Sequence, residues 1–165
     1  MKYIDTSVII AALDPSDPRR EKLVKFLEQE KDKVISELVL LELASVICRR
    51  QDVLASITKK LRLRNEQMVL AIILYIIKRF KLRYVRTDNQ TIMPIIGSIY
   101  SPIAIAITIS KNVRLRALDL LHVAYVKLLK SKGVTINELV TADEDFEKAR
   151  EYLKKELNVD VLILG

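Results

Sequence analysis

Short apolar runs alternate with longer amphipathic stretches along almost the whole chain. The short runs predict five strands, at residues 2–4, 34–35, 82–85, 138–141 and 159–164. The longer stretches predict helices at residues 8–13, 18–31, 37–50, 116–132 and 143–156. They also predict one helix that ends at residue 80 and another that begins at residue 101. Strands that alternate with helices are typical of a parallel sheet covered on both faces, so the pattern predicts an α/β fold.

Polar residues between these runs predict where the elements begin and end. Asp17 suits a helix N-cap with Pro18 at the first helical position, and Gly133 suits a helix end. Thr141 and Glu144 match the spacing of a capping box. Residues 87–100 match neither period, so we expect an irregular segment there that contacts a substrate or a partner.

Length and composition favour one globular domain over residues 1–165. Half of the 165 residues are hydrophobic and 30% are charged, which excludes a disordered chain. The apolar stretch at 92–109 is interrupted by Pro94, Gly97 and Pro102, so we expect no membrane span. Cys48 is the single cysteine and the first residues do not resemble a signal peptide, so we expect a cytoplasmic protein.

The net charge of +7 favours a polyanionic partner, nucleic acid first. The basic residues bunch in the sequence, although solvated helix ends would explain such bunching equally well. Our candidates for contact with nucleic acid are Arg49, Arg50, Lys59, Lys60, Arg114 and Arg116.

Several acids lie against apolar sequence, where an unpaired charge is costly. Asp5 ends the first predicted strand, and ligands of open α/β sheets bind at the carboxyl ends of strands. Capping of the next helix is the alternative role of Asp5. Glu42 follows Leu41 and shares a helix face with Leu38 and Val46. Pairing with Arg49 or Arg50 is its alternative.

A second group of acids lies in the last third of the chain. Asp119 opens a helix between two leucines, and capping is again the alternative. His122 lies on the same helix face as Asp119, where it either packs or bonds to a carboxylate or phosphate. Asp143 follows the fourth strand, and Asp145 is a further acid whose role stays open. A cluster of carboxylate oxygens suits Mg²⁺ or Mn²⁺, whereas one histidine and one cysteine are too few for zinc.

Four segments resemble the PIN-domain family, and within it the VapC-type toxin ribonucleases. They are residues 3–7, 36–42, 115–124 and 141–146, which occur in the family's order. The resemblance implies a three-layer fold with a central parallel sheet of about five strands and helices on both faces. It also implies catalytic, metal-binding acids at Asp5, Glu42, Asp119 and Asp143.

The resemblance also implies accessory roles, an activity and partners. Accessory hydroxyls would come from Thr6, Ser7 and Thr141, with Asp145 and His122 as further accessory candidates. The implied activity is Mg²⁺- or Mn²⁺-dependent hydrolysis of RNA phosphodiester bonds, giving 5′ phosphate and 3′ hydroxyl ends. The implied partners are a small antitoxin protein and a second copy of the chain.

Two alternatives remain open at this stage. One is an RNA-processing nuclease without an antitoxin, and another is a PIN-like module that binds RNA or protein without cutting. A response-regulator receiver or a haloacid-dehalogenase phosphatase fits poorly, because Asp5 is followed by Thr6 and Ser7 rather than by a second acid. A homodimer contact could come from the apolar helices between residues 61 and 77, although those residues also suit the core.

Overall fold

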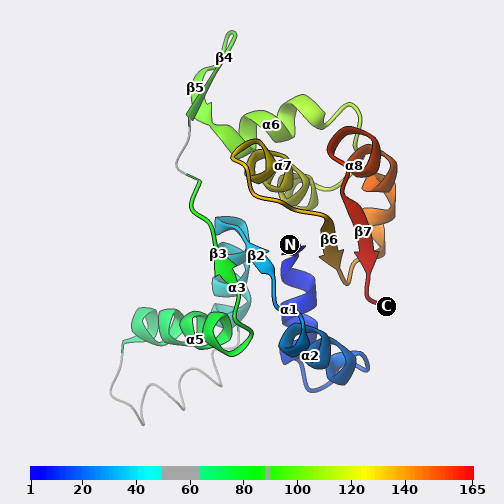
Figure 1. Ribbon diagram of the computed structural model, residues 1–165. Coiled ribbons are helices and arrows are strands. Elements are labelled where there is room, and N and C mark those ends of the chain that lie inside the picture. Colours follow the sequence, from blue (N-terminus) through cyan, green and yellow to red (C-terminus); the bar gives the residue numbers. More distant parts are fainter. Residues whose placement is uncertain (50–63, 88–89) are drawn as a thin grey trace.

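A sheet of five short parallel strands forms the centre of the computed structural model, which describes residues 1–49, 64–87 and 90–165 (Figure 1). The strand order is β3-β2-β1-β6-β7. The strands are β1 (Lys2–Ile4), β2 (Lys33–Ile35), β3 (Arg83–Tyr84), β6 (Glu138–Thr141) and β7 (Asp160–Ile163). All four pairings are parallel, as the alternation of apolar runs and helices predicts.

The two faces of the sheet bury different residues because side chains alternate along each strand. Ile4, Ile35 and Val140 pack into one apolar cluster with residues of α1 (Thr6–Leu13), α2 (Arg20–Gln29) and α5 (Asn65–Arg79). Tyr3, Val34 and Leu139 pack into a second cluster on the opposite face. That cluster includes residues of α6 (Ser101–Ile109), α7 (Ala117–Ser131) and α8 (Arg150–Leu157).

Helix α3 (Glu37–Arg49) contributes to both clusters, with Val39 and Leu43 in the first and Leu38 in the second. Helices therefore cover both faces of the sheet, and the predicted three-layer α/β fold is confirmed (Figure 1). Within the residues described, no helix is long and apolar enough to cross a membrane.

The strand order places a topological switch point between β1 and β6. From β1 the chain continues to β2 and β3 on one side, and later returns to build β6 and β7 on the other side. Ligands of open α/β sheets bind in the crevice that forms at such a point, outside the carboxyl ends of the strands. Asp5 follows β1 and Thr141 ends β6, so both lie at this crevice.

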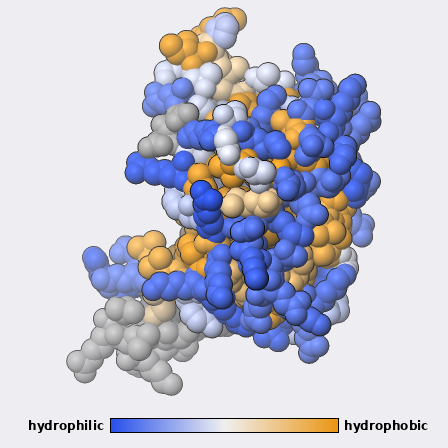
Figure 2. Space-filling model, viewed as in Figure 1, coloured by the Kyte–Doolittle hydropathy of each residue, from blue (hydrophilic) through white to orange (hydrophobic). Residues whose placement is uncertain are grey.

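The expectation of an irregular segment before α6 is wrong. Strands β4 (Gln90–Met93) and β5 (Gly97–Tyr100) form an antiparallel hairpin that projects from the rest of the protein (Figure 1). Its tip carries Ile95, which is fully exposed with a φ of 73°, and Ile92 is 83% exposed. Figure 2 shows hydrophobic atoms at this tip, whereas hydrophilic residues cover most of the same view.

Two predicted caps are also wrong, because the capping side chains have other partners. Helix α2 begins at Arg20, since the Asp17 carboxylate accepts the backbone N–H of Arg19 at 2.8 Å and closes a turn before it. The predicted helix at 143–156 is a 3₁₀ segment, η1 (Glu144–Ala149), followed by α8. Asp143 caps η1 by accepting the N–H of Asp145, and Thr141 takes no part in a capping box.

Candidate metal centre

Asp5 is the residue around which the candidate site is built. It occupies the N-cap position of α1, yet its side chain makes no capping hydrogen bond. One carboxylate oxygen, Oδ2, accepts the hydroxyl of Ser7 at 2.5 Å and that of Thr141 at 2.7 Å. The Ser7 oxygen in turn accepts the backbone N–H of Ala142 at 2.9 Å, which ties the loop after β6 to the start of α1.

The surroundings of Asp5 favour its ionised form. Only 4% of the residue is exposed, and burial alone would raise the pKa of its carboxyl. The charge of His122, a hydrogen bond from that ring and the hydroxyls of Ser7 and Thr141 outweigh burial and lower the pKa to about 2. Asp5 is therefore a carboxylate at neutral pH, as a metal ligand must be.

Glu42 reaches the same place from α3. Its Oε2 accepts the hydroxyl of Thr6 and lies 2.9 Å from Nε2 of His122. The side chain is 20% exposed, so it lies at the rim of the crevice rather than in the core. Arg49 is exposed, and Arg50 lies outside the described residues. Inward contacts with Thr6 and His122 thus replace the pairing with Arg49 that was the alternative for Glu42.

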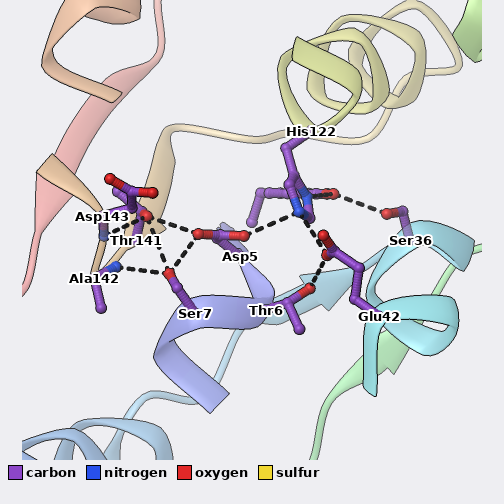
Figure 3. Close-up of polar contacts among 10 residues, drawn as sticks. Asp5, Thr6, Ser7, Ser36, Glu42, His122, Thr141, Ala142 and Asp143 are labelled. Carbon is purple, nitrogen blue, oxygen red and sulfur yellow. Dashed lines mark hydrogen bonds and ion pairs between the residues drawn. The ribbon is translucent and has the colours of Figure 1, made fainter. Parts of the chain in front are cut away.

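His122 joins the two acids. Its Nε2 lies 3.0 Å from Oδ1 of Asp5 and 2.9 Å from Oε2 of Glu42, and the residue is 1% exposed (Figure 3). Burial lowers the pKa of His122, but Tyr3, Asp5 and the hydrogen bonds to both carboxylates raise it well above its usual value. One ligand atom from each of Asp5, Glu42 and His122 lies within 4.8 Å of the other two.

Two hydroxyl groups that the sequence analysis did not select extend this arrangement inward. The Tyr3 hydroxyl lies 2.8 Å from Nδ1 of His122 and 2.8 Å from Oγ of Ser36. Burial is the main cause of a raised pKa for Tyr3, so its hydroxyl keeps its proton. The available signal was chemical, since Tyr3 places a hydroxyl within β1 and Ser36 places one directly after β2.

Asp119 and Asp143 lie beside this group. Asp119 is in the first turn of α7, and Arg116 rather than Asp119 holds the N-cap position. Burial raises the pKa of Asp119, and the negative charges of Asp143 and Asp5 raise it further. Asp143 is half-buried, and its backbone N–H donates to the Thr141 hydroxyl at 3.0 Å. Asp119 therefore lies within the electrostatic reach of both other acids.

The remaining candidates lie further from Asp5. Asp145 pairs with Lys148 at 2.5 Å and with Arg116 at 3.9 Å, and the hydrogen bond from Lys148 is the main cause of its lowered pKa. Arg114 and Arg116 are exposed, as is Arg49. The other candidates for RNA contact, Arg50, Lys59 and Lys60, lie outside the described residues.

The chemistry of the donor set fits a hard divalent cation. Carboxylate oxygens dominate it, and Mg²⁺ and Mn²⁺ prefer oxygen ligands. The raised pKa of Asp119 has the physical cause expected where acids gather, namely burial beside like charges. A cation among Asp5, Glu42, Asp119 and Asp143 would offset that repulsion.

Comparison with known proteins gives this arrangement a family. The family model described as "PIN domain" matches residues 2–152, which is most of the chain. No curated protein matches the chain in sequence. Among solved structures, the fold is similar to that in "Crystal structure of VapBC2 from Rickettsia felis bound to a DNA fragment from their promoter". That likeness has a TM-score of 0.50 at 13% identity and covers 98% of this chain and 97% of the other. The chain belongs to the PIN domain family.

Proposed function

We propose that this protein is a divalent-metal-dependent endoribonuclease and the toxin of a toxin–antitoxin pair. The observation that carries the proposal is the meeting of Asp5, Glu42 and His122 within 4.8 Å at the switch point of the sheet. Membership of the PIN domain family supports a nuclease, and the net charge of +7 supports a polyanionic substrate.

Asp5, Glu42, Asp119 and Asp143 would hold Mg²⁺ or Mn²⁺. Such an ion, when bound, activates water near neutral pH and stabilises charge on the oxygens of a phosphodiester. Ser7 and Thr141 orient the Asp5 carboxylate through one of its oxygens, and Thr6 orients Glu42. These hydroxyls fix the acids before substrate arrives.

Arg116 is the best-placed candidate for contact with the RNA backbone. Its side chain is 82% exposed at the start of α7, and its charge acts on Asp119. Arg49 and Arg114 are also exposed. Arg116, whose charge reaches Asp119, would hold phosphates near the acids, and binding would weaken as salt rises.

The partner part of the proposal concerns exposed apolar surface near the centre. A pocket of about 340 Å³ between α3 and the α6–α7 pair is lined by residues that include Leu41, Ile103 and Leu121. Leu41 is 66% exposed, and Ile107 and Leu118 are also exposed. Helix α5 turns Ile73 and Ile76 into the core but leaves Leu70, Leu74 and Tyr75 exposed, so this face and the outer face of α5 are both candidates for contact with a second copy. The likeness to VapBC2 supports an antitoxin as a further partner, and we propose that it covers the acidic crevice.

Cleavage assays with metal-site variants test the proposal. Purified protein, freed of any bound partner, would be incubated with pools of RNA and of DNA in Mn²⁺, in Mg²⁺ and in EDTA. We expect RNA cleavage with either metal, no cleavage in EDTA, and loss of cleavage in Asp5→Asn and Asp119→Asn. Asp145→Asn is the matched control, because Asp145 pairs with Lys148. Folded protein that cuts nothing in any metal would refute the nuclease and favour a binding module.

A further inference from the structure

A buried chain of hydrogen bonds reaches the candidate metal centre from inside the protein. It runs from Oγ of Ser36 to the hydroxyl of Tyr3 and on to Nδ1 of His122, with both contacts at 2.8 Å. None of the three residues is more than 1% exposed. The other ring nitrogen, Nε2, faces Asp5 and Glu42.

Packing holds the imidazole of His122 in one orientation. The Tyr3 ring meets it nearly edge-on, with centroids 5.8 Å apart and planes at 69°. The Phe146 ring lies at 6.3 Å. Tyr3 and Phe146 are fully buried in the apolar cluster on the α7 face of the sheet. The ring therefore has little room to turn away from the carboxylates.

The hydrogen bonds decide which nitrogen serves the acids. Ionised carboxylates only accept hydrogen bonds, so Nε2 must carry a proton to lie 3.0 Å from Asp5 and 2.9 Å from Glu42. Tyr3 occupies Nδ1, and Ser36 provides the second partner of the Tyr3 hydroxyl. The chain thus keeps the Nε2–H pointing at both acids.

We propose that Tyr3 and Ser36 are positioning residues that act through His122 to hold Asp5 and Glu42 at the spacing a divalent cation needs. The inference rests on the proposed function, because it assumes that these acids bind a metal. Partners beyond the ligands commonly fix the orientation of metal-binding groups, and their loss typically weakens metal affinity about 10- to 100-fold.

A packing role alone does not account for the hydroxyls. Tyr3 lies in the middle of β1 and its ring is part of an apolar cluster, where phenylalanine would fill nearly the same space. A buried hydroxyl is unfavourable unless it is hydrogen-bonded, so apolar packing gives no reason for one here. The Tyr3 hydroxyl bonds both to the His122 imidazole and to Ser36, so it links Ser36 to the candidate metal centre.

Mn²⁺ affinity tests the proposal without any cleavage assay. Free Mn²⁺ would be measured by electron paramagnetic resonance during titration of wild type, Tyr3→Phe, Ser36→Ala and His122→Gln. We expect roughly 10-fold or greater weakening in His122→Gln and Tyr3→Phe, and a smaller loss in Ser36→Ala. Tyr125→Phe is the matched control. Tyr125 is a second buried tyrosine, on α7, and the partner of its hydroxyl is the Tyr100 hydroxyl at 3.3 Å. Its affinity should equal that of wild type.

The single histidine gives a second readout that a merely structural role would not move. With histidine labelled with ¹⁵N at its ring nitrogens, the labelled signals come from the two ring nitrogens of His122 alone. We expect Nε2 to stay protonated when Mg²⁺ is added to wild type, and Tyr3→Phe to broaden or shift both signals while Tyr125→Phe does not. Ser36→Ala serves the same comparison if Tyr3→Phe fails to fold.

Each contrary result has a definite meaning. Unchanged Mn²⁺ affinity and unchanged ring signals in folded Tyr3→Phe or Ser36→Ala would overturn the positioning role. Loss of the Nε2 proton on Mg²⁺ addition would overturn it too, because His122 would then be a ligand itself. Wild type that binds no Mn²⁺ would refute the proposed function instead.

Discussion

Thr141→Val is the most direct test of how the Asp5 carboxylate is held. Thr141 is fully buried and donates to Oδ2 of Asp5 at 2.7 Å, while its oxygen accepts the N–H of Asp143 at 3.0 Å. Valine has nearly the same shape but offers neither interaction. The substitution therefore removes hydrogen bonds without opening a cavity, and the change in free energy reports on the hydroxyl.

The expected loss can be worked out from these contacts. A hydrogen bond to a charged group contributes about 1.5–3 kcal/mol. Asp5 keeps its bond from Ser7, and Asp143 is half-buried, so water can replace the lost acceptor of its N–H. We expect the free energy of unfolding of the metal-free protein to fall by about 2 kcal/mol. For a chain of this length that corresponds to a drop of roughly 4–8 °C in Tm.

Urea unfolding of metal-free protein at pH 7 measures this loss, with Thr141→Ser as the control. Serine keeps the hydroxyl and loses one buried methyl group, which is worth about 0.8 kcal/mol of burial before any cost of the small cavity left behind. We expect Thr141→Val to be the less stable variant by more than 1 kcal/mol. A Thr141→Val protein as stable as Thr141→Ser would show that the hydroxyl does not hold Asp5, and our account of the site would fail there.

Four further predictions follow from the same contacts. Mn²⁺ at about 100 times its Kd should stabilise the protein by ~2.7 kcal/mol. Thermal unfolding should then show a rise in Tm of roughly 5–11 °C, which EDTA should reverse and Asp5→Asn should abolish. The pKa of Asp5 lies at about 2, below its ordinary 3.8, so its ionised form stabilises metal-free protein above pH 4, and this stability is lost as pH falls through 2. The shift corresponds to ~2 kcal/mol. Urea unfolding of wild type and Asp5→Asn between pH 6 and pH 2 would show the two free energies of unfolding drawing together as the pH falls. Asp145→Asn should leave the Mn²⁺ affinity measured by titration within about twofold of wild type. The partner of Asp145 is Lys148, and a residue that does not bind the metal affects its affinity only where it orients a ligand. Arg116→Ala should weaken RNA binding and reduce the salt slope of log Kd by about 1 in filter-binding assays, and an unchanged slope would remove Arg116 from the RNA surface.

The sheet could be predicted from the sequence because its signals are local. Strands β1, β2 and β6 are short, mostly apolar runs that are each followed by a helix, and that order favours parallel pairing. The β4–β5 hairpin escaped prediction because its strands are largely exposed and show no alternation of apolar and polar residues, although Pro94 and Gly97 mark its turn. The tip places Ile95 at a φ of 73°, where glycine or asparagine is usual and a β-branched residue is rare.

The candidate site was only partly predictable for a different reason. Asp5, Glu42 and His122 could each be selected from the apolar sequence around them, but their meeting depends on which strands are neighbours. His122 was selected for sharing a helix face with Asp119, whereas its nearest polar partners are Asp5, Glu42 and Tyr3. Tyr3 and Ser36 were missed, because a tyrosine in a strand and a serine before a helix have ordinary structural explanations.

The position of Asp5 explains why the centre forms where it does. A side chain at the N-cap of α1 would normally accept a helix N–H, and such a cap is worth about 1 kcal/mol. Asp5 forgoes this bond and directs its two oxygens to opposite sides, Oδ2 toward Ser7 and Thr141 and Oδ1 toward His122. Because β1 lies between β2 and β6, Thr141 at the end of β6 reaches Asp5 directly, and His122 links Asp5 to Glu42 on α3 after β2. A carboxylate held from both sides, beside the positive end of a helix, stays ionised in a buried place, which is the condition that a metal ligand has to meet.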